Sequence, residues 1–222
     1  MSEPNEGPDS TAVPGRYRRR DVGTPPTRSV LIVDAWTLTP TIYRGDRYPK
    51  DLQGDAFITD SPTNLVHRMK IVDDGTGRLT AKNGYRRGEL LASSDERFRP
   101  VSLSSAPDGT IYVVDMYRGV VQAGGIWSEY LTDYIKAHDL QLPVARGRIW
   151  RVVYGNGPNA RGPQPSLSSA TPAQLVQTLS HPNGWWRDTA QQLLVQRHDL
   201  SVVPQLTTAA ETAPDWRTRL QA

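Results

Sequence analysis

Residues 107–116, Pro-Asp-Gly-Thr-Ile-Tyr-Val-Val-Asp-Met, carry the clearest fold signal in this sequence. Pro-Asp-Gly is typical of a tight turn, and the β-branched and aromatic run that follows it is typical of a strand. The run Pro-Val-Ser-Leu at 100–103 precedes the turn and supplies a partner strand. We therefore predict an antiparallel hairpin over about 100–116.

Short strand-like runs separated by turn signals extend from residue 30 to residue 154. They occur on both sides of the hairpin, at 54–60, 64–71, 89–93 and 147–153. This spacing predicts two antiparallel meanders, about 36–94 and 100–154, in the manner of β-propeller blades. The predicted fold class is mainly β, a partial propeller of about two blades over 30–154. A sandwich or barrel is the alternative on periodicity alone.

One helix is expected inside the β region. Trp127, Tyr130, Leu131, Tyr134 and Ile135 follow each other at spacings of three and four residues, which places them on one face of a helix. We predict that this helix runs from about 127 to 138. We expect its aromatic stripe to pack on the sheet.

The period becomes helical after a Gly- and Pro-rich linker over 155–170. Leu175 and Leu179 mark a first helix over 171–180, and Leu193 lies on the apolar stripe of a second over 184–197, with Asn183 as its N-cap. Such a pair is typical of a HEAT-like repeat. We expect 171–222 to be the truncated start of this repeat.

Composition excludes several classes of protein. The 26 Lys and Arg residues nearly balance the 23 Asp and Glu residues, and a basic run at 16–20 lies in a Pro- and Gly-rich stretch over 1–28. We predict a disordered tail there and no nucleic-acid partner. The chain has no cysteine, so disulfides, thiolate metal sites and covalent c-type haem are excluded. No signal peptide or membrane span is expected from the sequence as it stands.

Six runs resemble a known family in sequence and in order. They are Gly-Asp-Ala-Phe-Ile-Thr-Asp (54–60), Asn-Leu-Val-His-Arg (64–68), Ser-Ser-Asp-Glu-Arg-Phe-Arg-Pro-Val (93–101), the run 107–119, Gly-Arg-Ile-Trp-Arg-Val (147–152) and His-Pro-Asn-Gly-Trp-Trp-Arg-Asp-Thr-Ala-Gln-Gln-Leu-Leu (181–194). The first five look like the closing part of the propeller in exported bacterial proteins called membrane-bound dehydrogenases. Those propellers are similar to the ones of soluble glucose and sorbosone dehydrogenases. The sixth looks like the start of the HEAT-like segment that follows the propeller in the same family.

The resemblance implies a quinoprotein-type sugar or alcohol oxidoreductase, with pyrroloquinoline quinone and calcium in a full-length relative and with export to the periplasm or cell envelope. It covers about residues 30–222 and lacks the earlier blades, which supply the catalytic histidine in the soluble enzymes. We therefore expect a fragment that needs the missing blades as partners and is inactive alone. The alternative is a non-catalytic binding or scaffold module for a glycan or protein, because fold does not fix activity.

Four residues are candidates for holding a cofactor: Arg97, Arg99, Asp115 and Arg118. A guanidinium fork recognises carboxylates, so arginines near strand ends could orient a tricarboxylic quinone or an acidic sugar. The interpretation that the pattern favours is structural, with Asp95 paired to Arg97 and Asp115 paired to Arg118 between blades.

His67 is the only histidine in a predicted strand and could serve as a base or a metal ligand. It shares a strand face with Leu65, Met69 and Ile71, whereas Val66 and Arg68 share the other face. This alternation favours a hydrogen-bonded core histidine. No histidine pair has metal-ligand spacing, so no zinc site is predicted, and no catalytic residue is assigned.

Overall fold

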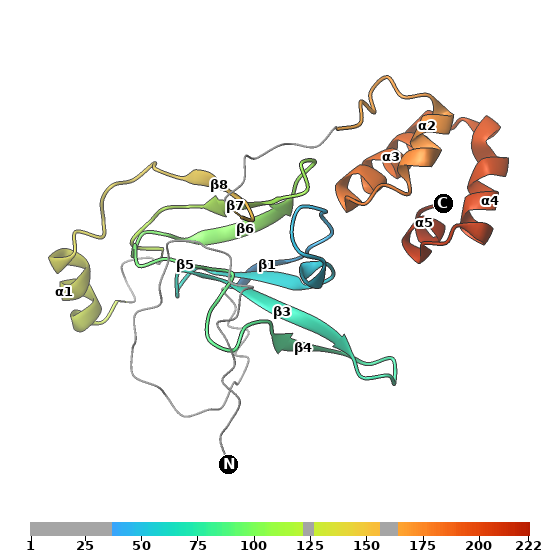
Figure 1. Ribbon diagram of the computed structural model, residues 1–222. Coiled ribbons are helices and arrows are strands. Elements are labelled where there is room, and N and C mark those ends of the chain that lie inside the picture. The colour runs from blue at the N-terminus through green and yellow to red at the C-terminus, as the bar shows by residue number, and fades with distance from the viewer. Residues whose placement is uncertain (1–36, 122–126, 156–163) are drawn as a thin grey trace, which may run out of the picture.

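The computed structural model describes residues 37–121, 127–155 and 164–222 of the chain. Two antiparallel sheets come first, and a group of helices follows them (Figure 1). The sheets do not close into a ring within these ranges, so the described part of the chain shows stacked antiparallel sheets rather than a complete propeller. The predicted tail over 1–28 lies outside the described residues.

The first sheet surrounds one long strand. Strand β3 (Leu65–Asp73) pairs with β2 (Ala56–Asp60) on one side, and β2 pairs in turn with β1 (Thr37–Ile42). The other side of β3 is shared by β4 (Leu79–Asn83) and β5 (Leu91–Ala92), which pair with its C-terminal and N-terminal parts respectively. The predicted strands at 54–60, 64–71 and 89–93 are therefore present.

The second sheet contains the predicted hairpin. Strands β6 (Pro100–Ser105) and β7 (Ile111–Asp115) pair in antiparallel fashion, and β8 (Arg148–Val152) adds to β7. Gly109 in the turn has a φ of 78°, which favours glycine. The buried carboxylate of Asp108 accepts from the amide and the hydroxyl of Thr110, at 3.1 and 2.7 Å. The hairpin prediction over 100–116 is confirmed.

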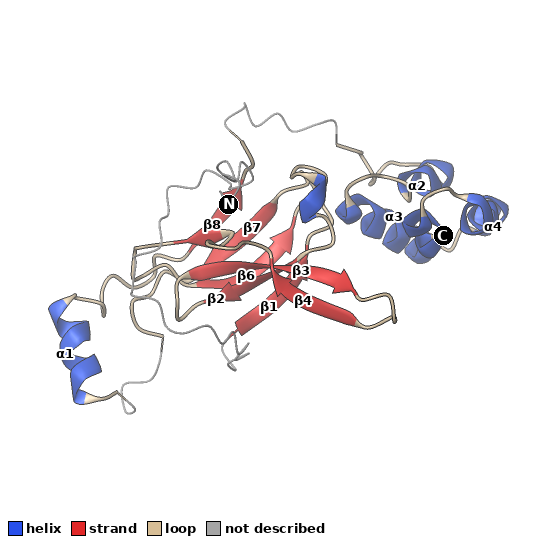
Figure 2. Cartoon of the chain, turned by 60° about the horizontal axis from the view of Figure 1, so that its bottom comes forward, coloured by secondary structure: helices blue, strands red, loops and turns tan. Residues whose placement is uncertain are grey.

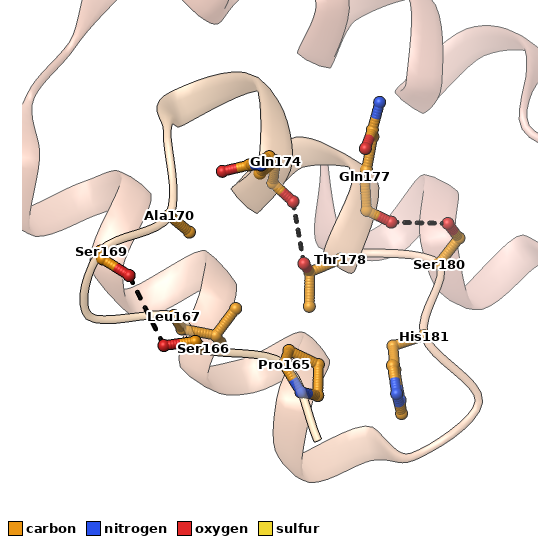
Figure 3. Close-up of a pocket in the computed structure, with 10 residues that line it drawn as sticks. All are labelled: Pro165, Ser166, Leu167, Ser169, Ala170, Gln174, Gln177, Thr178, Ser180 and His181. Atoms are coloured by element: carbon orange, nitrogen blue, oxygen red, sulfur yellow. Dashed lines mark hydrogen bonds between the residues drawn. The ribbon is translucent and has the colours of Figure 1, made fainter. Parts of the chain in front are cut away.

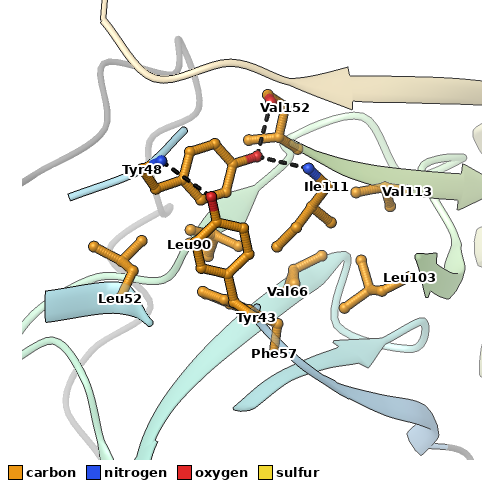
Figure 4. Packing of buried hydrophobic residues seen from close by; sticks show 10 residues of the cluster. All are labelled: Tyr43, Tyr48, Leu52, Phe57, Val66, Leu90, Leu103, Ile111, Val113 and Val152. Atoms are coloured by element: carbon orange, nitrogen blue, oxygen red, sulfur yellow. Dashed lines mark hydrogen bonds between the residues drawn. The ribbon is translucent and has the colours of Figure 1, made fainter. Parts of the chain in front are cut away.

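An apolar core fills the space between the two sheets (Figure 4). Two stacked tyrosines from the segment between β1 and β2 lie inside it, with ring centroids 4.6 Å apart. Tyr43 donates its hydroxyl to the Gly109 carbonyl at 2.7 Å, and Tyr48 donates its hydroxyl to the Val152 carbonyl at 2.7 Å. Burial raises the pKa of Tyr43 to about 12, so this phenol stays a neutral donor. The two hydroxyls thus connect the segment after β1 to the second sheet.

Helix α1 (Glu129–Ala137) begins at the N-cap Ser128 and stands apart from both sheets (Figures 1 and 2). The predicted helix at 127–138 is confirmed, but the prediction that it packs on the sheet is wrong. The loop before β6 holds it instead: Glu96 accepts from the Tyr134 hydroxyl at 2.5 Å and contacts Nδ1 of His138 at 3.1 Å. Only Ile135 of the helix is buried, because polar contacts rather than an apolar face fix its position.

The C-terminal part contains four α-helices around a second apolar core. The two predicted helices are present: Leu175 of the first and Ala190 of the second are fully buried, whereas Leu193 is half-buried. Asp215 caps the last helix. The helices are α2 (Pro172–Thr178), α3 (Gly184–Arg197), α4 (Val203–Thr212) and α5 (Trp216–Gln221). A short 3-10 turn, η3 (Leu200–Val202), lies between α3 and α4, and another, η1 (Lys50–Leu52), lies between β1 and β2.

Asn183 joins the helices to the second sheet. Its side chain is 1% exposed and accepts from the Trp185 amide at 3.0 Å, which caps α3. Its Nδ2 donates to the Ala106 and Pro107 carbonyls in the β6–β7 turn, at 3.1 and 3.0 Å. The Trp186 indole donates to the same Pro107 carbonyl at 2.8 Å. One short segment therefore starts the helix and binds it to the hairpin.

A bidentate ion pair lies beside this junction. Arg44, which follows β1, contacts both carboxylate oxygens of Asp188 on α3, at 2.7 and 2.8 Å. The Arg44 carbonyl also accepts from the Gly184 amide at 2.8 Å. A side chain at Gly184 would place its Cβ 2.8 Å from that of Arg44, so glycine permits this close approach. Both sheets therefore contact the start of α3.

Replacing Asn183 with Ala is expected to lower the free energy of unfolding by about 2 kcal/mol, because one cap is lost and two turn carbonyls lose a donor. Asn183→Asp is the informative companion, since it keeps the capping oxygen but removes the Nδ2 donor. Urea denaturation should show both variants to be destabilised. If Asn183→Asp is as stable as the wild-type chain, the contact with the hairpin contributes nothing.

Candidate functional site

Arg99 is the centre of the predicted cofactor cluster, and its guanidinium is bonded to main-chain carbonyls. Nε donates to the Arg118 carbonyl at 2.9 Å, and the two terminal nitrogens donate to the carbonyls of Gly119, Ser61 and Pro62, at 2.9, 2.8 and 3.2 Å. Burial lowers the pKa of Arg99, although nearby carboxylates oppose the shift. The side chain thus connects the turn after β2 to the segment after β7.

Arg97, two residues earlier in the loop before β6, also donates to main-chain carbonyls. Nε donates to the Leu142 carbonyl at 2.9 Å, and one terminal nitrogen donates to the carbonyls of His138 and Asp139, at 3.3 and 2.9 Å. The His138 and Asp139 carbonyls lie at the C-terminal end of α1, where a cation is favourable. Together with Glu96, Arg97 therefore anchors α1.

Asp115 is buried at the end of β7 and caps the neighbouring backbone. One carboxylate oxygen accepts from the amides of Arg99 and Tyr117, both at 2.8 Å. The other accepts from the Trp150 indole at 3.0 Å and lies 3.5 Å from Nε of Arg148. The expected partner was the Arg118 side chain, but Arg118 joins the cluster through its carbonyl. Likewise, the Asp95 carboxylate accepts from the Arg97 amide at 3.0 Å.

The structure therefore brings the four predicted residues close together, in the loop before β6 and at the end of β7 with the segment after it. Main-chain groups make most of the contacts. Side chains of Arg97 and Arg99 point at carbonyls, and the Asp115 carboxylate points at amides and an indole. Chemically, this arrangement holds loops and a helix in place. The structural interpretation named the side-chain pairs Asp95–Arg97 and Asp115–Arg118, whereas the hydrogen-bond partners found here are main-chain groups and the Trp150 indole.

Arg68 is the main charged site that the sequence analysis missed. Arg68 is 1% exposed, and its Nε contacts Asp55 at 2.6 Å while a terminal nitrogen contacts the Asp51 carboxylate at 3.0 Å. The Tyr85 ring centroid is 5.2 Å from the guanidinium carbon. Val66 and Arg68 share one face of β3 as predicted, but both are almost fully buried, whereas the core was expected on the opposite face with His67. The strict alternation with Val66 was the available signal.

His67 lies on the opposite side of β3 between two carboxylates. Nδ1 is 2.8 Å from Glu89 and Nε2 is 3.3 Å from Asp60. Hydrogen bonds to Asp60 and Glu89 raise the pKa of His67 to about 9, against partial burial, which lowers it. At neutral pH the ring is an imidazolium, which has no lone pair to take up a proton or bind a metal. The expected hydrogen-bonded histidine is present, in an ionic rather than an apolar setting.

The His67 pKa predicts a pH dependence of stability. A folded-state pKa of about 9, above the ordinary histidine pKa of 6.5, means that the stabilisation is fully present below pH 6.5 and is lost as the pH rises through about 9. We expect the wild-type chain to lose about 2 kcal/mol more than His67→Gln between about pH 6 and about pH 10, after a discount for partial exposure. Urea titrations at several pH values measure this difference. Parallel curves for the two chains would contradict it.

A pocket of about 590 Å³ lies in the helical part, between the segment at 165–170 and helix α2 with the turn after it (Figure 3). Ten residues between Pro165 and His181 line it, and they carry hydroxyl, carboxamide, imidazole and small apolar side chains. No residue of the predicted cofactor cluster is among them. Sequence reasoning missed this pocket because its residues read as a linker and the polar side of a helix.

Neither a metal centre nor a membrane helix is found in the part of the chain that the structure describes. Over 37–121, 127–155 and 164–222, no group of three or more His, Cys, Asp or Glu side chains could hold a metal ion. Within the same ranges, no helix has the length and apolar character needed to cross a membrane.

Comparison with known proteins identifies a family. No curated protein matches the chain, and no solved structure matches it. Residues 35–156 match a family described as Domain of unknown function (DUF7133). The match spans both sheets and helix α1, including the loop with Arg97 and Arg99. Because it covers more than half of the 222 residues, the chain belongs to the DUF7133 family.

Proposed function

We propose that this chain is a non-catalytic recognition module, in which two propeller-like blades and the first helices of a HEAT-like repeat form one unit. The observation that carries the proposal is the state of Arg97 and Arg99. Their guanidinium groups donate to main-chain carbonyls of the chain itself. An arginine that recognises a carboxylate needs its fork open toward the ligand. These two side chains instead stabilise the arrangement of loops and helix.

The packing of the sheets supports the description as blades. Each sheet is an antiparallel meander in which most consecutive strands are neighbours. The first strands of the two sheets lie against each other, and the Thr41 hydroxyl donates to the Leu103 carbonyl at 3.0 Å. Face-to-face packing of small antiparallel sheets through their first strands is the arrangement of adjacent propeller blades.

A quinone-dependent sugar or alcohol oxidoreductase is the second candidate. It is supported by the resemblance of the runs at 93–101 and 107–119 to membrane-bound dehydrogenases. In that case other blades would supply the base and most of the cofactor cradle. A catalytic site requires its groups to be held to within roughly 0.5 Å, which needs the closed ring. The chain by itself would again be inactive.

The purified chain is therefore expected to show no dye reduction with pyrroloquinoline quinone, calcium and a panel of sugars and alcohols. The same preparation should bind a component of a glycan array if it is a recognition module. Turnover that disappears in Arg99→Ala or Arg118→Ala, but persists in Arg78→Ala, would overturn the proposal. Circular dichroism of each variant shows whether a loss of turnover reflects unfolding.

A further inference from the structure

The wall of the pocket beside α2 is held in place by α3. Arg197 near the end of that helix donates to the carbonyls of Leu167, Ser168 and Ala170, at 3.2 Å for the first two. The side chains of Leu167 and Ala170 are buried in the helical core. The segment at 165–170 is therefore a fixed part of the helical unit, so the pocket is a preformed one.

Two side chains of the pocket have a fixed donor. Gln174 accepts from the Thr171 amide through Oε1 at 2.8 Å, within the capping box of α2, which leaves Nε2 as the donor of that carboxamide. His181 accepts from the Asn183 amide through Nδ1 at 3.0 Å. In the neutral ring the proton then lies on Nε2, which becomes a donor as well.

Two other side chains present acceptors. The Thr178 hydroxyl donates to the Gln174 carbonyl, and the Ser180 hydroxyl donates to the Gln177 carbonyl, both at 2.8 Å (Figure 3). Each hydroxyl has one proton, so its oxygen offers only lone pairs to a ligand. The pocket thus combines donors and acceptors whose directions are set by the backbone of α2 and of the turn after it.

Among the residues that the structure describes, 37–121, 127–155 and 164–222, no Lys, Arg, Asp or Glu side chain lines the pocket, and Pro165 adds an apolar surface. An anion could accept hydrogen bonds from Gln174 and His181, but the lone pairs of Thr178 and Ser180 would repel it. An ammonium ion could donate to Thr178 and Ser180, but the N–H donors of Gln174 and His181 would repel it. A sugar hydroxyl both donates and accepts hydrogen bonds, so it matches the donors and the acceptors of the pocket. The C–H face of a sugar ring can lie against the apolar surface of Pro165. The volume of about 590 Å³ lies within the usual range for small ligands. We infer that this pocket binds a neutral saccharide, which rests on the recognition function proposed above.

The test is a binding titration of the full chain with glucose, galactose, xylose and their short oligomers, compared with glucuronate and glucosamine. Isothermal titration should show binding of at least one neutral sugar and weaker binding of its charged counterparts. Thr178→Val and Ser180→Ala each remove one hydroxyl and should weaken binding about 3- to 10-fold. Thr189→Val is the matched control, because its hydroxyl makes the same type of bond to the Trp185 carbonyl on α3, outside the pocket.

Unchanged affinity in both Thr178→Val and Ser180→Ala would overturn the assignment of the pocket. Preferential binding of glucuronate or glucosamine, or no binding of any neutral sugar, would overturn it too. The recognition function is judged separately, by dye reduction and by the glycan array. Array binding that both pocket variants retain would leave that function standing and move its site elsewhere.

Discussion

Replacing Arg68 with Met is expected to lower the free energy of unfolding by about 3–5 kcal/mol, the usual cost of breaking a buried ion pair from one side. The guanidinium contacts the buried Asp55 at 2.6 Å and the Asp51 carboxylate at 3.0 Å. Its removal leaves the Asp55 carboxylate buried without its nearest cation. Urea denaturation of the whole chain, followed by far-ultraviolet circular dichroism, measures the loss.

Two companion variants make this result specific. Lys70→Met changes an exposed cation two residues further along β3 and should alter stability by less than about 0.5 kcal/mol. The double variant Arg68→Met/Asp55→Asn removes both charges and should recover part of the loss, because the uncompensated carboxylate is gone. If the double variant is less stable than Arg68→Met by as much as Asp55→Asn alone destabilises the chain, then the loss in Arg68→Met does not come from the charge pair.

Replacing Leu175 with Ala is expected to cost about 3 kcal/mol, because the side chain is fully buried between α2 and α3 and its truncation leaves a cavity. Leu200→Ala is the matched control, since that leucine is 79% exposed. Thermal unfolding compares the two variants. A similar effect for both would mean that the helical core does not limit the stability of the chain.

Local signals were read correctly from the sequence. The turn at 107–109, the N-cap Asn183 and the helix bounds at 184–197 follow from preferences of single residues at fixed positions. Strand β1 (Thr37–Ile42) was not singled out, because Pro40 interrupts its β-prone pattern. Strand β4 and helix α4 carry little apolar signal, and neither contains a buried residue.

Tertiary contacts set the limit of prediction at the candidate site. Arg97 and Arg99 were singled out by type, but their partners are carbonyls, which every residue possesses and no sequence pattern reveals. Val66 and Arg68 were placed on one face of β3, but the core was expected on the face with Leu65 and His67, because that face carries more apolar residues. The carboxylates that make the burial of Arg68 possible, Asp51 and Asp55, come from a separate part of the chain.

The turn between β6 and β7 is bound by distant parts of the chain at four successive carbonyls. Ala106 and Pro107 accept from Asn183, while Asp108 accepts from Arg47 and Gly109 accepts from Tyr43. Hairpin turns are ordinarily where insertions are tolerated during evolution. Here one added residue would shift these acceptors away from donors in two separate regions at once. Family members should therefore keep the length of this turn and vary in length at the exposed β3–β4 turn around Gly75.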